Sequence, residues 1–267
     1  MISKILIPAD GSVNGAVALD YGIYTALKLN ASLTGLHVLE VNLLQGPLLA
    51  DISGAVGTAL NEKADFVIDA FRKRCLAAGV PPEIKKVTGK IDDAISEEGR
   101  NADLILMAKK GEHFHFQEGM FPGSVTENVI RNSGKPVMIT PDRFHEIESM
   151  AVAYDGSSSA AKALAFSLKL SHQAAWPLTA VIISSDLEKA ALLSAEIEET
   201  AQAQETECEV IILSGEESEE ILNFIKEGAV ELMAMGAYGN NRLRELLLGS
   251  TTSRVVQNSP IPVLLTH

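Results

Sequence analysis

SKILIPADGSVNGAVALDYGIYTALKLNASLTGLHVLE, residues 3–40, is repeated later in the chain as ESMAVAYDGSSSAAKALAFSLKLSHQAAWPLTAVIISSD, residues 148–186. Each copy has an apolar run that ends in Asp-Gly-Ser, then an alanine-rich helical pattern, then Leu-Thr opening a second apolar run. Two further pairs of segments repeat in the same order: 102–111 with 230–239, and 123–140 with 249–266. Such self-similarity predicts a tandem duplication of one structural unit.

The repeat predicts two domains, residues 1–141 and 149–267, in a chain of 267 residues. A polar stretch led by a proline, PDRFHEIE (141–148), is expected to link them. The second copy is shorter in its middle, at the counterpart of residues 41–58. Each unit then has the size of an ordinary domain.

Within each copy, short β-branched runs alternate with amphipathic helical runs. Strands are expected near 2–8, 32–38, 83–88, 103–107 and 136–140, and again near 149–154, 178–184, 208–213, 231–235 and 262–266. Helices are expected near 13–29, 58–78, 91–100 and 124–132, and again near 158–173, 187–204, 217–227 and 250–258. This alternation predicts an α/β fold with right-handed βαβ units: two tandem doubly wound five-stranded parallel-sheet domains. In such sheets ligands bind at the carboxyl ends of the strands.

Composition and charge exclude several classes of protein. No apolar run approaches the ~20 residues of a membrane helix, and the N-terminal residues lack the pattern of a signal peptide and predict a first strand. The two cysteines, Cys75 and Cys208, are too few for a disulfide framework and fit a reducing cytosol. The net charge of −13, concentrated in the second copy, argues against nucleic acid as a partner.

The loop after the fourth strand of the second copy carries three glycines and a run of hydroxyls. Gly236 and Gly239 let the backbone turn tightly or approach a ligand closely. Gly249, Ser250, Thr251 and Thr252 then open a helix, whose free amide groups attract anions. The pattern predicts a phosphate cradle. A helix cap after a loop would also favour these residue types.

Asp155 lies at the end of the first strand of the second copy, and two roles are open for its carboxylate. Its carboxylate could accept a hydrogen bond from a ribose hydroxyl, or it could cap the Asp-Gly-Ser bend as an Asx-turn. The sequence has neither a G-x-G-x-x-G dinucleotide fingerprint nor a phosphate-binding P-loop. Neither an acidic cluster typical of Mg²⁺ nor a nucleophile with a partner base is arguable, so no catalytic or metal-ligating residue is predicted.

These copies resemble the universal stress protein family in its tandem form, whose ATP-binding members carry G-x2-G-x9-G-[ST] after the fourth strand. Gly236, Gly239, Gly249 and Ser250 match that pattern. The resemblance implies an adenine-nucleotide alpha-hydrolase-like fold with strand order 3-2-1-4-5, and a site for ATP or AMP, with or without Mg²⁺. The nucleotide-binding residues it implies are Ala153, Tyr154, Asp155, Ile183, Met235, Gly236, Tyr238, Gly239, Gly249, Ser250, Thr251 and Thr252.

The first copy departs from the family pattern. Ala108 replaces the first glycine, and eleven residues (112–122) separate Gly111 from the next conserved pair of the pattern. A second, weaker nucleotide site would comprise Asp10, Val38, Gly111, Gly123, Ser124, Val125 and Thr126. The insert alternates His113 and His115 with phenylalanines. It could pack over the vacant pocket, whereas a metal site would need further ligands.

The resemblance also implies a cytoplasmic protein whose domains pair through their last strands as an internal pseudo-dimer, with a homodimer of whole chains as a further level. The leading hypothesis is a stress-response protein that binds ATP or AMP as a regulatory ligand, with at most slow hydrolysis. One alternative is a weak ATPase or adenylyl transferase. Another is an interaction module that binds a protein or a small apolar ligand through the first domain.

Overall fold

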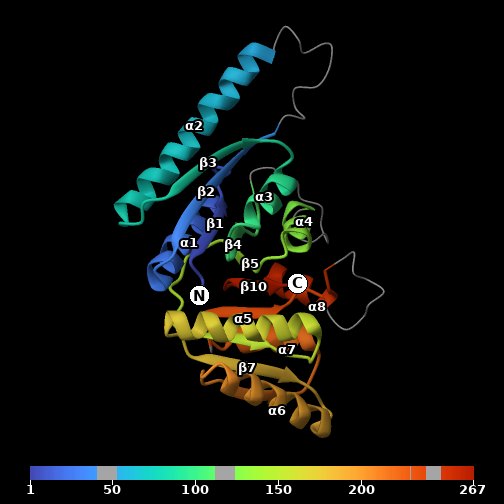
Figure 1. Ribbon diagram of the computed structural model, residues 1–267. Coiled ribbons are helices and arrows are strands. Elements are labelled where there is room, and N and C mark those ends of the chain that lie inside the picture. The colour runs from blue at the N-terminus through green and yellow to red at the C-terminus, as the bar shows by residue number, and fades with distance from the viewer. Residues whose placement is uncertain (41–52, 112–123, 229, 239–247) are drawn as a thin grey trace.

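A computed structural model describes residues 1–40, 53–111, 124–228, 230–238 and 248–267 (Figure 1). The first copy contains β1 (Lys4–Pro8), α1 (Val13–Leu29), β2 (Ser32–Leu39), α2 (Ser53–Ala77), β3 (Glu83–Thr88), α3 (Ile91–Gly99), β4 (Leu104–Ala108), α4 (Ser124–Ser133) and β5 (Val137–Thr140). The second contains β6 (Met150–Ala153), α5 (Ser158–Ala174), β7 (Leu178–Ile183), α6 (Leu187–Ala203), β8 (Glu209–Leu213), α7 (Glu217–Lys226), β9 (Leu232–Gly236), α8 (Ser250–Asn258) and β10 (Val263–Thr266). The α/β class is confirmed.

The strands form one ten-stranded sheet in the order β3-β2-β1-β4-β5-β10-β9-β6-β7-β8. Each copy therefore has the expected order 3-2-1-4-5, and neighbouring strands within a copy run parallel. The two copies meet where β5 and β10 pair antiparallel, with Met138 opposite Leu264. Four-residue apolar strands meet there, as expected for strands buried on both faces.

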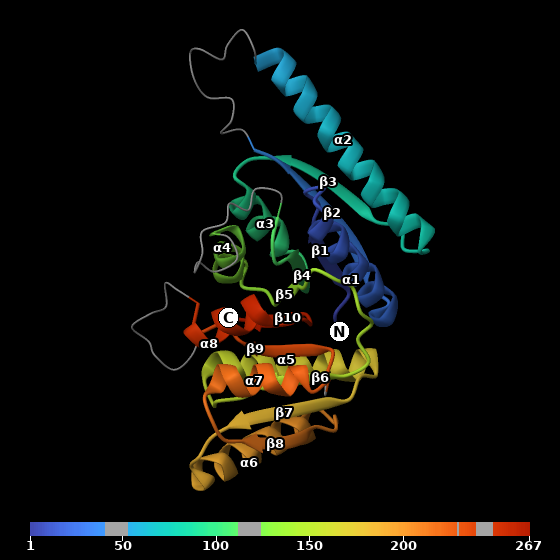
Figure 2. The same ribbon diagram turned by 180° about the vertical axis from the view of Figure 1, so that it is seen from behind.

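Helices cover both faces of this sheet (Figures 1 and 2). One apolar cluster joins the sheet to α1, α2, α5 and α6, and a second joins its other face to α3, α4, α7 and α8. The buried residues of α2 show why it packs this way, since Ala64, Val67, Ile68, Phe71 and Cys75 repeat at helical spacing. Among the described residues, no helix is both long and apolar enough to span a bilayer.

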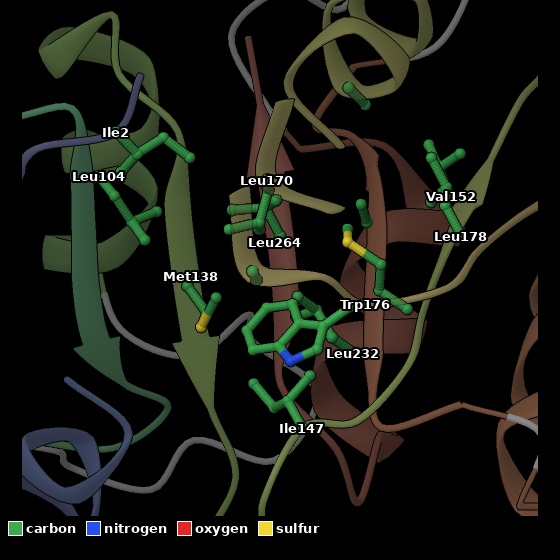
Figure 3. Close-up of a cluster of buried hydrophobic side chains, with 14 of the residues drawn as sticks. Ile2, Leu104, Met138, Ile147, Val152, Leu170, Trp176, Leu178, Leu232 and Leu264 are labelled. Atoms are coloured by element: carbon green, nitrogen blue, oxygen red, sulfur yellow. The ribbon is translucent and has the colours of Figure 1, made fainter. Parts of the chain in front are cut away.

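The first of these clusters crosses from one copy to the other. Figure 3 shows Leu104 and Met138 from the first copy in the same group of side chains as Leu264 and Trp176 from the second. The Trp176 indole stacks on the ring of Tyr24 in α1, with centroids 6.3 Å apart and planes inclined by 6°. The copies therefore share a core as well as a sheet.

The connection between the copies is anchored along its length. The Tyr24 hydroxyl donates to the carbonyl of Ile147 (2.6 Å), and the Tyr21 hydroxyl donates to the carbonyl of Arg143 (3.2 Å). Phe144 packs edge-on against Tyr21, with ring centroids 4.9 Å apart, and Ile147 is fully buried. The stretch expected to be a polar linker thus contributes two apolar side chains to the core.

Candidate functional site

The carboxyl ends of β6, β7 and β9 meet at one edge of the sheet in the second copy. β6 pairs with both β7 and β9 in parallel, so Ala153, Ile183 and Gly236 end neighbouring strands. The helix α5 follows β6 after a short turn, and the start of α8 lies beside the end of β9, where the Gly249 amide donates to the Ala237 carbonyl. This is the edge at which doubly wound sheets bind ligands.

Asp155 forms the turn that leads from β6 into α5. Its Oδ1 accepts a hydrogen bond from the amide of Ser157 (2.9 Å), and Gly156 has φ +78°, which favours glycine. The Ser157 hydroxyl in turn accepts from the amide of Ala160 and caps the helix (3.1 Å). The structure thus shows the Asx-turn at Asp155, and the ribose hydrogen bond stays a prediction. Within the described residues its second oxygen, Oδ2, has no hydrogen-bond partner.

Gly236 lies where β9 passes the start of α5. A Cβ at this position would sit 2.5 Å from Ser159 Oγ and 2.9 Å from the backbone nitrogen of Ala160. The Ser159 hydroxyl donates to the carbonyl of Tyr238, just after the strand. Only glycine allows this close approach of two backbones.

The start of α8 is held against the end of β9. The amide of Gly249 donates to the carbonyl of Ala237 (3.2 Å), and the buried Thr252 hydroxyl donates to the carbonyl of Gly236 (3.0 Å). The first amide of α8 that bonds back into the helix is that of Ser253, to Gly249 (2.9 Å). The N–H groups of residues 250–252 precede it, and such groups with the helix dipole attract anions.

Apolar side chains line the same face of the sheet beside these groups. Met235 is buried in the cluster that α7 and α8 cover, and Ala153, Ile183 and Tyr238 pack against it. Side chains of this kind can cover the flat faces of an aromatic ligand. The structure therefore brings together Ala153, Asp155, Ile183, Met235, Gly236, Gly249, Ser250, Thr251 and Thr252. Gly239 lies outside the described residues.

Tyr154 is placed differently from its neighbour Ala153. Successive residues of a strand point to opposite faces, and the Tyr154 side chain joins the other apolar cluster. Its hydroxyl donates to Glu196 Oε2 on α6 (3.0 Å). Only the backbone of Tyr154 therefore lies beside the other predicted nucleotide-binding residues.

Tyr154 makes stability depend on pH at high pH. Burial, with the Glu196 carboxylate, raises the pKa of its phenol from 10.0 to about 12. The folded state therefore holds this proton more tightly, so its contribution is fully present below pH 10 and is lost as pH rises towards 12. We expect the melting temperature of the wild type to fall a few degrees further over that range than that of Tyr154→Phe. Thermal unfolding monitored by circular dichroism checks this, and parallel curves would contradict it.

Tyr238 turns towards the first copy. Its ring packs edge-on against the C-terminal His267, with centroids 4.8 Å apart and planes at 86°. Burial raises the pKa of its phenol, while Arg131 and Glu127 of α4 act on it in opposite directions. Of the described residues, none accepts or donates a hydrogen bond at this hydroxyl. Its side chain thus lies at the junction of the copies.

One residue at the site, and one at the far end of α8, carried no signal in the motif. Ser159 ties α5 to the loop after β9 through the Tyr238 carbonyl. From the first copy, the Lys109 ammonium donates to the carbonyl of Gln257 near the C-terminus of α8, and burial lowers the pKa of Lys109. A cation at this end of the helix complements its dipole. Hydroxyls near a required glycine could have indicated Ser159, but a contact from the other copy could not be read from one repeat.

The equivalent edge in the first copy has the same turn but a different loop. Oδ1 of Asp10 accepts from the amide of Ser12 (2.9 Å), and Oδ2 would lie 3.1 Å from a Cβ on Gly111. Ala108 stands where the second copy has Gly236. Val38 and Val125 are partly buried, Thr126 is buried, and Ser124 begins α4. Gly123 and the insert 112–122, with its histidines, lie outside the described residues.

Comparisons with known proteins agree with this architecture. A family model described as "Universal stress protein family" matches residues 1–141 and again residues 146–267. Universal stress protein Slr1230 of Synechocystis sp. (strain ATCC 27184 / PCC 6803 / Kazusa) is 29% identical, over 98% of this chain and 99% of that protein.

Solved structures with the same arrangement include a universal stress protein from Archaeoglobus fulgidus DSM 4304. It has a TM-score of 0.79 and 27% identity, over 98% of this chain and 97% of that one. A functionally unknown protein from Pseudomonas aeruginosa PAO1 has a TM-score of 0.62 over 99% of this chain and 92% of its own. At 13% identity, that second likeness concerns the fold alone.

Proposed function

The chain belongs to the universal stress protein family, and on that premise we propose that its second domain, residues 149–267, binds ATP or AMP as a regulatory ligand in the response to stress. One observation carries the proposal. The intact loop pattern Gly236-x2-Gly239-x9-Gly249-Ser250 ends at a helix N-terminus that lies beside the end of β9. The resemblance of this pattern to that of ATP-binding family members supports a nucleotide rather than a simple anion.

Each part of a nucleotide has a group to receive it. The phosphates would accept from the N–H groups of residues 250–252 and from the Ser250 hydroxyl. A ribose hydroxyl would donate to Asp155 Oδ2, because Oδ1 is used in the turn. The adenine would lie against Ala153, Ile183 and Met235. Mg²⁺ would arrive on the phosphates, since within the described residues no three His, Cys, Asp or Glu side chains form a metal cluster.

In this function the second domain binds the nucleotide without a catalytic step, and the first domain, residues 1–141, packs against it. Ala108 and the altered loop spacing argue for a weaker nucleotide site there. Since β5 and β10 pair with one another, a homodimer of whole chains would use a different surface. A weak ATPase, the alternative, would show as Mg²⁺-dependent turnover.

Asp155→Asn tests the ribose contact with little disturbance to the fold. Asparagine keeps an oxygen for the Ser157 amide, so the turn is retained, while the charge that strengthens the ribose hydrogen bond is lost. We expect affinity for ATP and AMP, measured by isothermal titration calorimetry, to fall about tenfold.

Asp10→Asn is the matched control, because it makes the same change in the same turn of the first copy. The affinity of the tighter site, in the second domain, should equal that of the wild type. Equal losses of affinity in Asp155→Asn and Asp10→Asn would contradict the assignment of the site to the second domain. Mass spectrometry of small molecules released from the purified chain should also detect an adenine nucleotide, and a protein that carries none and binds none in titration would overturn the proposed function.

A further inference from the structure

A carboxylate stands beside the helix end that would receive the phosphates. Glu217 is the first residue of α7 and Thr251 the second residue of α8. The Thr251 hydroxyl donates to Glu217 Oε2 (3.1 Å), and the Glu217 side chain is exposed to solvent. A phosphate held by the Thr251 amide would therefore lie within a side chain's length of a negative charge.

The first copy has no carboxylate at the equivalent place. The first residue of α3 is Ile91, and the second residue of α4 is Val125. Both are partly buried and pack against the same apolar cluster. The nearest carboxylate of α3 is that of Asp92, one residue later, whose Oδ2 accepts from Asn128 of α4 (2.6 Å) and from Lys90 (2.8 Å). The pair of Glu217 with Thr251 at the start of α8 is therefore particular to the second copy.

Neighbouring charges do not neutralise Glu217 within the described residues. Arg254 on α8 is the basic residue of this group, and it pairs with Glu216 Oε2 (3.4 Å) and Glu219 Oε1 (2.9 Å). The Glu216 carboxylate also accepts from the Ser218 hydroxyl and the Glu219 amide. The Arg254 guanidinium thus pairs with two carboxylates, and α7 carries two more, those of Glu217 and Glu220. Among the described residues, the charges on the α7 side of the α8 N-terminus are therefore net negative.

We infer that Glu217 limits the charge of the phosphate chain that the second domain accepts, so that the site prefers AMP to ATP. This inference rests on the proposed nucleotide function. A helix N-terminus offers only about half a positive charge, whereas each added phosphate adds negative charge that Glu217 repels. A nucleoside monophosphate needs the helix N–H groups and little else.

Glu217→Gln tests the inference directly. Glutamine keeps the length of the side chain and an oxygen for the Thr251 hydroxyl, and removes only the charge. Wild type should bind AMP more tightly than Mg²⁺-free ATP in titration calorimetry. In the variant, the ratio of the two affinities should shift towards ATP by about fivefold, and the shift should shrink when salt or Mg²⁺ is added.

Glu227→Gln is the matched control. It removes the same charge at the other end of α7, about 15 Å along the helix, which is beyond the reach of screened charges. Its ratio should match that of the wild type. An unchanged ratio in Glu217→Gln, with both nucleotides still bound, overturns the inference and leaves the proposed function standing. A rise in affinity that is equal for AMP and ATP and independent of salt also overturns it. Absence of nucleotide binding in the wild type overturns both.

Discussion

Replacement of Gly236 by valine is expected to reduce nucleotide affinity at least a hundredfold and to lower the free energy of unfolding by about 1–3 kcal/mol. The first added carbon already meets Ser159 Oγ at 2.5 Å and the Ala160 nitrogen at 2.9 Å. A serine hydroxyl can rotate away, but a backbone nitrogen inside a helix cannot. The end of β9 would have to move off α5, and α8 would lose its position because Thr252 is bonded to the Gly236 carbonyl.

Titration calorimetry gives the affinity of this variant, and thermal unfolding gives its stability. Gly236→Ala should show a smaller loss of both quantities, since it adds one carbon rather than three. Gly57→Ala in α2 is the control, because a Cβ there meets nothing within 4 Å, and it should bind nucleotide normally. Wild-type affinity in a folded Gly236→Val protein would show that the ligand does not use this loop.

Replacement of Trp176 by alanine is expected to destabilise the whole chain by about 3–5 kcal/mol. The indole is 3% exposed and belongs to the cluster that both copies share. It also stacks on Tyr24, which holds the connection between the copies through Ile147. Removing the ring leaves a cavity at the junction, so both halves should lose stability together in a single transition.

Trp176→Phe tests whether the loss in Trp176→Ala comes from packing. Among the described residues, the buried Nε1 of Trp176 has no hydrogen-bond partner, so a smaller aromatic ring loses contact area but no hydrogen bond. We expect it to recover more than half of the stability that alanine removes. Denaturant unfolding followed by far-ultraviolet circular dichroism checks both variants, because Trp176 is the single tryptophan and its fluorescence is lost. Two separate transitions in Trp176→Ala, one of them at the wild-type midpoint, would contradict a shared core.

The fold could be predicted well because the same order of strands and helices occurs in both copies. Apolar runs such as those of β1 and β10 are typical of doubly buried strands, and their alternation with helices leaves few topologies. The start of α2 was missed by several residues, at Ser53 rather than near 58. The glycines at 54 and 57 weaken the local helical signal there, and the buried stripe from Ala64 onward decides the helix instead.

The candidate site was predictable where one repeat contains all its parts. Asp155, Gly236 and Gly249 come together because strand ends and helix starts of a single copy build that edge. The side chains of Tyr154 and Tyr238 could not be placed in this way. The Tyr154 side chain joins the cluster on the opposite face of the sheet, and the Tyr238 ring packs against His267 at the end of the chain. The pattern of one repeat gives no information on the contacts that its side chains make with the other copy.

The antiparallel pairing of β5 with β10 has a consequence for how such a chain can diverge. Two separate chains joined this way would come apart on dilution, since their association follows mass action. A covalent connection keeps the local concentration of the partner constant, so these halves stay paired at any protein concentration. It also means that a substitution such as alanine for glycine at position 108 enters one half only, whereas a homodimer would carry it twice. One half can then give up its ligand and still serve as the scaffold of the other.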